Sequence, residues 1–216
     1  SWGLWQSVRA GVRAAVRISE RGTRLTKLAR RFYTSANGGL ILVVLMVRVD
    51  FVAVALPGLT AVSGDVEGLD TMFFYMPEEA FADVAAYSHE ARQALNTFHL
   101  TVDVVNPILY TTFLVLLLSW LFRYGFSTES KMRALNIIPL GALLFDILEN
   151  IGITIMMAAY PAQPRWAAWL STISTMAKFS FIYVSLGLVL IGLVGAIINK
   201  FNKREAAGKP ASVIEK

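Results

Sequence analysis

The chain has 216 residues, 56% of them hydrophobic, a formal net charge of +5 and no cysteine. This composition is atypical of a soluble globular protein and predicts several membrane spans. The absence of cysteine excludes disulfides, thiolate metal sites and CxxC redox chemistry, and His89 and His99 are too few for a histidine-rich di-iron site. We therefore expect no metal and no cofactor.

Residues 1–37 form a basic arm that holds eight Lys or Arg residues and a single acid, Glu20. Arginines recur every four residues beside a stripe of Trp and Val, a pattern typical of an amphipathic helix lying on a membrane surface. Because this arm adjoins a membrane span, we expect anionic lipid such as cardiolipin, and not nucleic acid, as its partner. The residues expected to bind lipid are Arg9, Arg13, Arg17, Arg21 and Arg24.

The arm also resembles a mitochondrial presequence, since it is rich in arginine and nearly free of acids. Arg31-Phe32-Tyr33, followed by Thr34-Ser35, resembles the arginine-minus-three cleavage signal of such presequences, which would place the mature start at Thr34. The resemblance implies a protein of the mitochondrial inner membrane, with the arm either retained as a surface helix or removed. A bacterial inner-membrane protein with a basic cytoplasmic tail is the alternative.

The first predicted span covers about 40–56 and is expected to end at Pro57-Gly58. Arg48 and Asp50 lie near its centre. Because they are two residues apart, they cannot share a helical face, so each is expected to find a partner on another helix.

An acidic loop, 58–97, follows, with seven acids and one base, Arg92. Pro77, Glu78 and Glu79 predict a helix start, with proline in the first position and acids in the first turn. We expect a helix of about five turns that lies on the membrane face or continues into the next span. The preceding aromatic stretch, 73–76, is interpreted as an interfacial anchor.

Three more spans are predicted, at about 98–122, 135–160 and 166–198, followed by a polar tail, 200–216. Each carries polar residues at helical spacing on one face, and Pro107 is expected to kink the first of the three. These faces hold His99, Asp103, Asn106 and Tyr110 in the first; Asp146, Glu149 and Asn150 in the second; and Ser171, Thr175, Lys178 and Ser185 in the third.

The sequence thus predicts an all-α integral membrane protein with a four-helix transmembrane domain at 38–199. The arm, the 123–133 loop and the tail are basic, whereas the 58–97 loop is acidic. With four spans, the three basic regions fall on one side, so both termini are expected on the matrix or cytoplasmic side.

Polar residues from every span are predicted to lie at similar depth and to form an intramembrane polar layer. Isolated charges are not tolerated there, so they must pair or become neutral. The predicted members are Arg48, Asp50, His99, Asp103, Asn106, Tyr110, Asp146, Glu149, Asn150 and Lys178.

Two functions are compatible with this layer. If it serves only packing, the chain is an accessory, non-catalytic subunit of a mitochondrial inner-membrane complex, such as a respiratory complex or ATP synthase, and this is the favoured interpretation. The absence of a Walker loop, a G-x-G-x-x-G motif and Glu-x-x-His pairs supports it. The alternative is an intramembrane enzyme or carrier for a lipid or small hydrophobic substrate, with Asp103, Asp146, Glu149 and Lys178 as its site.

Overall fold

The computed structural model describes residues 27–63 and 68–208, and the described chain is helical with no strand. Most of the predicted basic arm, including all five arginines expected to bind lipid, lies outside the described residues; residues 27–35 are helical. The elements that follow are α2 (Gly38–Ser63), the 3₁₀ helix η1 (Leu69–Thr71), α3 (Pro77–Ala86), α4 (His89–Leu100), α5 (Val102–Gly125), the 3₁₀ helix η2 (Lys131–Ile137), α6 (Pro139–Ala159) and α7 (Arg165–Gly208).

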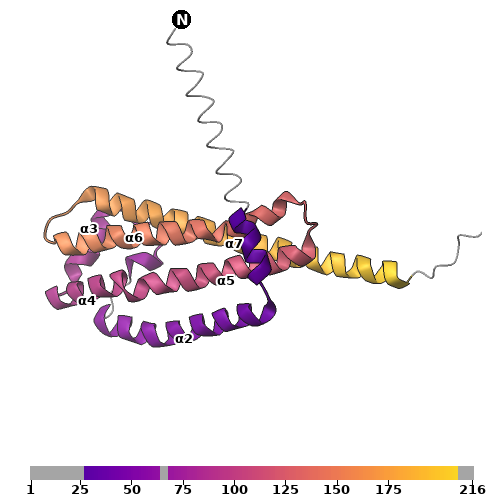
Figure 1. The fold of residues 1–216 in the computed structure, drawn as a ribbon. Helices are drawn as coiled ribbons and strands as arrows, with labels where there is room; N and C mark the ends of the chain where they lie inside the picture. Colours follow the sequence, from indigo (N-terminus) through magenta and orange to yellow (C-terminus); the bar gives the residue numbers. More distant parts are fainter. Residues whose placement is uncertain (1–26, 64–67, 209–216) are drawn as a thin grey trace, which may run out of the picture.

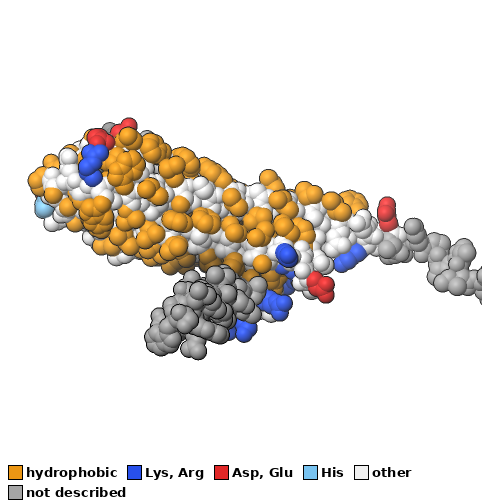
Figure 2. All heavy atoms as spheres, turned by 90° about the horizontal axis from the view of Figure 1, so that it is seen from above, with side chains coloured by type: hydrophobic (Ala, Val, Ile, Leu, Met, Phe, Trp, Pro, Cys, Tyr) orange, Lys and Arg blue, Asp and Glu red, His pale blue; other side chains and the backbone are white. Residues whose placement is uncertain are grey.

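Four helical stretches of the described chain are long and apolar enough to cross a membrane, which agrees with the predicted number of spans. Figure 2 shows a broad band of apolar side chains over the surface, with the charged side chains gathered toward its two ends. The protein is therefore an all-α membrane protein with several spans. The stretches are Gly38–Ala55, His89–Gly125, Lys131–Ala159 and Arg165–Glu205.

The helices pack around α5, which contacts α2, α6 and α7 (Figure 1). The most extensive pairing is between α6 and α7, which follow each other along the chain and lie side by side. In contrast, α2 packs on α5 and α4 at one edge of the bundle. This arrangement leaves one face of α5 between α2 and α7, and that face carries the polar residues of the site.

Two helices are longer than expected. The predicted end at Pro57 is wrong, because α2 continues through that proline to Ser63. Proline removes one backbone donor, whereas ending a helix inside a bilayer would leave several carbonyls without partners. At the other end of the chain, α7 continues ten residues past Ile198 into the predicted tail, since 199–207 contain neither proline nor glycine to stop it.

The helix expected to run for five turns from Pro77 is in fact two helices. Its start is as predicted, with Pro77 in the first turn and the Glu79 carboxylate accepting from the Met76 backbone N–H at 2.7 Å. Its length is wrong, because the chain breaks at Tyr87 and Ser88. The Ser88 hydroxyl accepts from the Ala91 N–H at 3.1 Å and caps α4, so a residue interpreted as a polar interruption is an N-cap.

The break in the second span lies at Thr101, and α5 continues as a helix through Pro107. The Thr101 hydroxyl donates to the Thr97 carbonyl at 2.5 Å, and its backbone N–H donates to Phe98. The Thr97 carbonyl thus accepts from the Thr101 hydroxyl in place of the Thr101 backbone N–H. Hydrogen bonds of this kind bend helices. Because of this bend, α4 and α5 together form one span with a change of direction near His99.

We predict that Gly152→Ala loosens the contact between α6 and α7. A Cβ on Gly152 would lie 2.8 Å from the Ser171 Cβ and 2.9 Å from the Ala167 carbonyl oxygen, so backbone must move. Overpacking of this kind costs about 1–3 kcal/mol. Gly187→Ala in α7 is the matched control, because its Cβ would meet nothing within 4 Å. Thermal unfolding in detergent measures both variants; equal midpoints would contradict the predicted packing.

Candidate functional site

The centre of the bundle holds a buried ion pair between Glu149 of α6 and Lys178 of α7. The Lys178 Nζ lies 2.5 Å from the Glu149 Oε2, and the Glu149 side chain is 0% exposed. The other carboxylate oxygen accepts from the Thr175 hydroxyl at 2.6 Å. These two helices thus bring together the acid and the base that the sequence placed at similar depth, and each charge has a specific partner.

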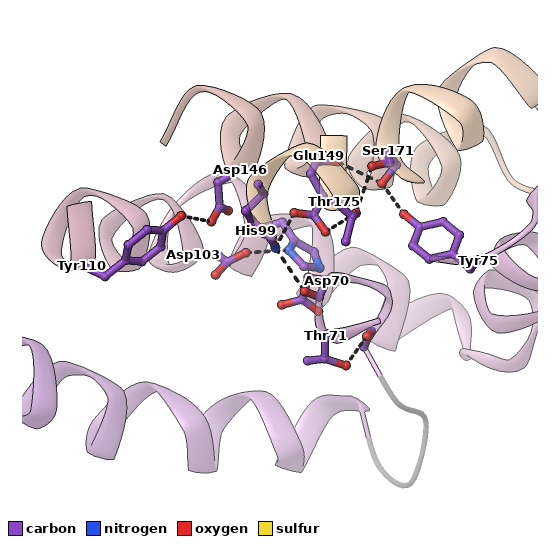
Figure 3. Close-up of polar contacts among 12 residues, drawn as sticks. Asp70, Thr71, Tyr75, His99, Asp103, Tyr110, Asp146, Glu149, Ser171 and Thr175 are labelled. Carbon is purple, nitrogen blue, oxygen red and sulfur yellow. Dashed lines mark hydrogen bonds and ion pairs between the residues drawn. The ribbon is translucent and has the colours of Figure 1, made fainter. Parts of the chain in front are cut away.

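The acidic loop also reaches this ion pair. Lys178 lies 13 residues after the start of α7, roughly 20 Å along the helix at 1.5 Å per residue. Nevertheless its Nζ donates to the backbone carbonyl of Asp70 in η1 at 3.1 Å. The segment around η1 therefore folds into the bundle, as Figure 3 shows for Asp70 and Thr71.

Tyr75 fixes the other end of this segment. Its hydroxyl lies 2.5 Å from the Ser171 hydroxyl, and its backbone N–H donates to Thr172 at 3.3 Å. The side chain is 1% exposed, so the interpretation of this aromatic as an interfacial anchor is wrong. Burial raises the pKa of the Tyr75 hydroxyl to about 12. The loop is thus held against α7 by polar contacts at two levels.

Two further polar pairs lie beside the ion pair (Figure 3). The His99 Nδ1 is 3.1 Å from the Asp103 Oδ2, joining the end of α4 to the start of α5. The Tyr110 hydroxyl donates to the Asp146 Oδ2 at 2.8 Å, joining α5 to α6. Each pair links two helices and leaves an acidic group near the same space.

That space is a cavity of about 500 Å³ between α2, α5 and α7. Its lining is polar on one side and apolar on the other, as a site for an amphipathic molecule requires. The polar lining consists of Arg48, Asp70, Thr71, Asp103, Asn106, Tyr110, Asp146 and Lys178, and the apolar lining of Leu45, Phe113, Leu114, Phe179, Ile182 and Leu186.

The charged groups of the lining are supported from behind. His99 and Glu149 do not line the cavity and are buried, yet they bind Asp103 and Lys178, which do. The buried His99 and Glu149 therefore fix the orientation of the Asp103 and Lys178 side chains that line the cavity. With Lys178 neutralised by Glu149, the lining keeps three carboxylates against the single guanidinium of Arg48.

Some predicted members of the polar layer do not fit the prediction. Asp50 is exposed on the outside of α2 and makes no ion pair with any described residue, so its place in the inward layer is wrong. The two-residue offset explains this, since Arg48 takes the inner face. The partner expected for Arg48 on another helix is also missing from the described chain, where its Nε has no hydrogen bond.

Two asparagines of the predicted layer have buried side-chain atoms without partners in the described chain. Asn106 lines the cavity, and its buried Oδ1 has no hydrogen bond. Asn150 is buried beside Glu149, as its helical face predicted, but it lies outside the cavity and its amide is also unpaired. An unpaired buried polar atom lowers the stability of the fold. A ligand in the cavity could give Asn106 a hydrogen-bond partner, whereas Asn150 lies where such a ligand would not reach it.

Sequence reasoning missed Asp70 and Tyr75. Asp70 was counted only as one of seven acids in the loop. The signal was the composition of its surroundings, because Leu69 and the run from Met72 to Met76 are too apolar for a loop that stays in water. Leu69 and Tyr75 are both buried in the structure.

Within the part of the chain that the structure describes, no three His, Asp or Glu side chains converge in a way that would hold a metal ion. Comparison of this chain with protein-family models, with curated proteins and with solved structures finds no match. The site geometry is therefore the basis for a proposal about function.

We predict that Lys178→Met destabilises the protein by about 3–5 kcal/mol, because it leaves the Glu149 carboxylate buried without its cation. The double variant Lys178→Met/Glu149→Gln, which removes both charges, should recover most of this loss. Thermal unfolding in detergent measures the coupling. If the two substitutions are simply additive, the pair does not hold α6 and α7 together.

Proposed function

We propose that this protein is an intramembrane enzyme or carrier that binds a lipid or small hydrophobic substrate in the central cavity. The observation that supports this alternative over a purely structural layer is the cavity itself. A layer that only specifies packing would close on its own partners, whereas this one leaves charged groups facing a space of about 500 Å³. Ionisable residues inside a membrane that face a cavity are typical of substrate sites.

The polar end of the substrate would lie against Asp103, Asp146 and Lys178, and its apolar part against Phe179 and the aliphatic side chains of α7. An excess of carboxylates favours a substrate whose polar end donates hydrogen bonds or carries an amine.

The same groups supply acid–base chemistry. The Tyr110 hydroxyl donates to Asp146, and His99 orients Asp103, so two carboxylates sit beside groups that can hold or pass a proton. Lys178, held in place by Glu149 and the Asp70 carbonyl, offers its remaining N–H donor to a negative charge that develops on a substrate. These groups would serve a carrier as binding groups and an enzyme as acid–base groups, in both cases for a molecule inside the cavity.

Native mass spectrometry and lipid analysis of the purified protein test this proposal. We expect a co-purifying amphiphile, retained at least about tenfold less well in Asp146→Asn and Asp103→Asn, since a charge-assisted hydrogen bond contributes about 1.5–3 kcal/mol. Asp50→Asn is the matched control, because the same change falls on a carboxylate outside the cavity. Equal occupancy in folded Asp146→Asn protein would contradict a binding role.

The second candidate is the accessory subunit of a mitochondrial inner-membrane complex, with cardiolipin at the basic arm. The observation that favours it is Asp50, midway along α2 on its exposed face, beside exposed Met46, Val47 and Val54. A carboxylate that faces lipid at this depth costs about 2.5–3.5 kcal/mol on insertion scales, and a cation on a neighbouring subunit's helix would offset that cost.

For this candidate we predict that the chain co-migrates with other subunits on a native gel and that Asp50→Leu releases it. Val54→Leu on the same exposed face is the control, because it changes shape without removing charge. The isolated Asp50→Leu chain should be no less stable than the original. A chain that runs alone in native membranes would exclude the accessory role.

A further inference from the structure

At the end of the bundle away from Arg165, two adjacent cavities flank the contact between α5 and α7. One, of about 570 Å³, has apolar walls from Trp120, Leu121, Tyr124, Leu193, Ala196 and Ile197, and Lys200, Lys203 and Arg204 at its rim. The other, of about 460 Å³, lies between the end of α5, the start of η2 and α7. Asn199 and Lys203 line both cavities, so the two spaces meet at α7.

The charges of these linings are all of one sign. The second cavity is lined by Arg123, Arg133 and Lys203, together with the polar side chains of Ser127, Thr128, Asn199 and Asn202. Among the residues that the structure describes, no acid lines either cavity. The five cations form no ion pair with a described residue, so they create a strongly positive region, and hydroxyl and amide groups beside them supply neutral donors.

Two of the cations are held in place by backbone. Arg133 donates from its Nη2 to the Arg123 carbonyl at 3.2 Å, at the end of α5, and its guanidinium lies over the Tyr33 ring. Arg123 donates from its Nη1 to the Tyr33 carbonyl at 3.2 Å. These contacts use only part of the five donors of each guanidinium, so both cations keep free donors on a fixed frame.

The two helices approach closely at small residues, which separates the cavities without filling them. A Cβ on Gly125 would lie 2.9 Å from the backbone nitrogen of Ala196. Asn199 then donates from its Nδ2 to the Tyr124 carbonyl at 2.7 Å and ties α7 to the end of α5. These contacts fix α7 against the end of α5, between the cavity lined by Trp120 and Leu193, called here the apolar groove, and the cavity lined by Arg123 and Arg133.

We infer that this end of the bundle binds one anionic phospholipid, with an acyl chain in the apolar groove and the phosphate at Asn199, Lys203 and Arg204. The groove distinguishes a lipid from a free phosphate compound, because it offers apolar walls directly below the cations. The site is separate from the central cavity, and it does not depend on the substrate proposed above.

The test is lipid binding to the full chain in detergent, measured by native mass spectrometry with phosphatidylglycerol and phosphatidylcholine. We expect phosphatidylglycerol to bind more tightly. The double variant Lys203→Gln/Arg204→Gln should weaken the binding of phosphatidylglycerol roughly 25-fold, because each cation near a membrane surface contributes about fivefold to the affinity. Arg30→Gln/Lys131→Gln is the matched control: it removes two exposed cations that line neither cavity, and binding should stay unchanged.

Three outcomes would overturn the inference. Equal affinity for the two lipids would mean that the cations do not select charge. An equal loss in both double variants would mean that overall charge, and not this site, attracts the lipid. If soluble glycerol phosphate competes as well as the lipid does, the pocket binds phosphate compounds without using the groove.

Discussion

The buried pair between Glu149 and Lys178 is the interaction on which the rest of the structure depends. Between helices in a bilayer there is little hydrophobic driving force, so specific polar contacts decide which faces meet. Here one contact joins α6 to α7, the most extensive helix pair, and the same Nζ also binds the carbonyl of Asp70. A single lysine therefore orients two spans and a loop.

The depth of this contact explains why the loop folds inward. A lysine paired with one carboxylate still has ammonium donors to satisfy, and water is scarce at that level. The carbonyl of Asp70 satisfies one of them. Tyr75 then anchors the following residues on Ser171 and Thr172, so that α3 begins close to α6 and α7. The polar centre thus determines the course of a segment that the sequence predicts to lie at the membrane surface.

This dependence also explains which features the sequence predicted. Helical spacing predicted that Asp146, Glu149 and Lys178 lie on inner faces, and all three are buried. The prediction works because a charged side chain that faces lipid within a span is energetically costly. Spacing could not reveal the break at Thr101, which comes from one hydroxyl that bonds back to Thr97.

Asp50 shows a different limit of the same reasoning. The rule that charges face inward predicts one buried face for each helix, but a helix with two charges two residues apart must turn one of them outward. Arg48 faces the cavity, and Asp50 does not. Which of the two is inside follows from the packing of α2 on α5, and that packing is information that a single helix sequence does not contain.

The balance of satisfied and unsatisfied groups bears on the choice between packing and chemistry. On the side of α6 and α7, Glu149 is paired with both Lys178 and Thr175, while the amide of Asn150 beside it has no partner in the described chain. On the side of α2, the Arg48 Nε and the Asn106 Oδ1 are buried without partners in the described chain, and both residues line the cavity. Unsatisfied polar atoms lower stability, so a layer evolved for packing alone gains nothing from them. A layer that must receive a polar ligand needs such atoms where they face the cavity, as those of Arg48 and Asn106 do, and this placement favours a binding site.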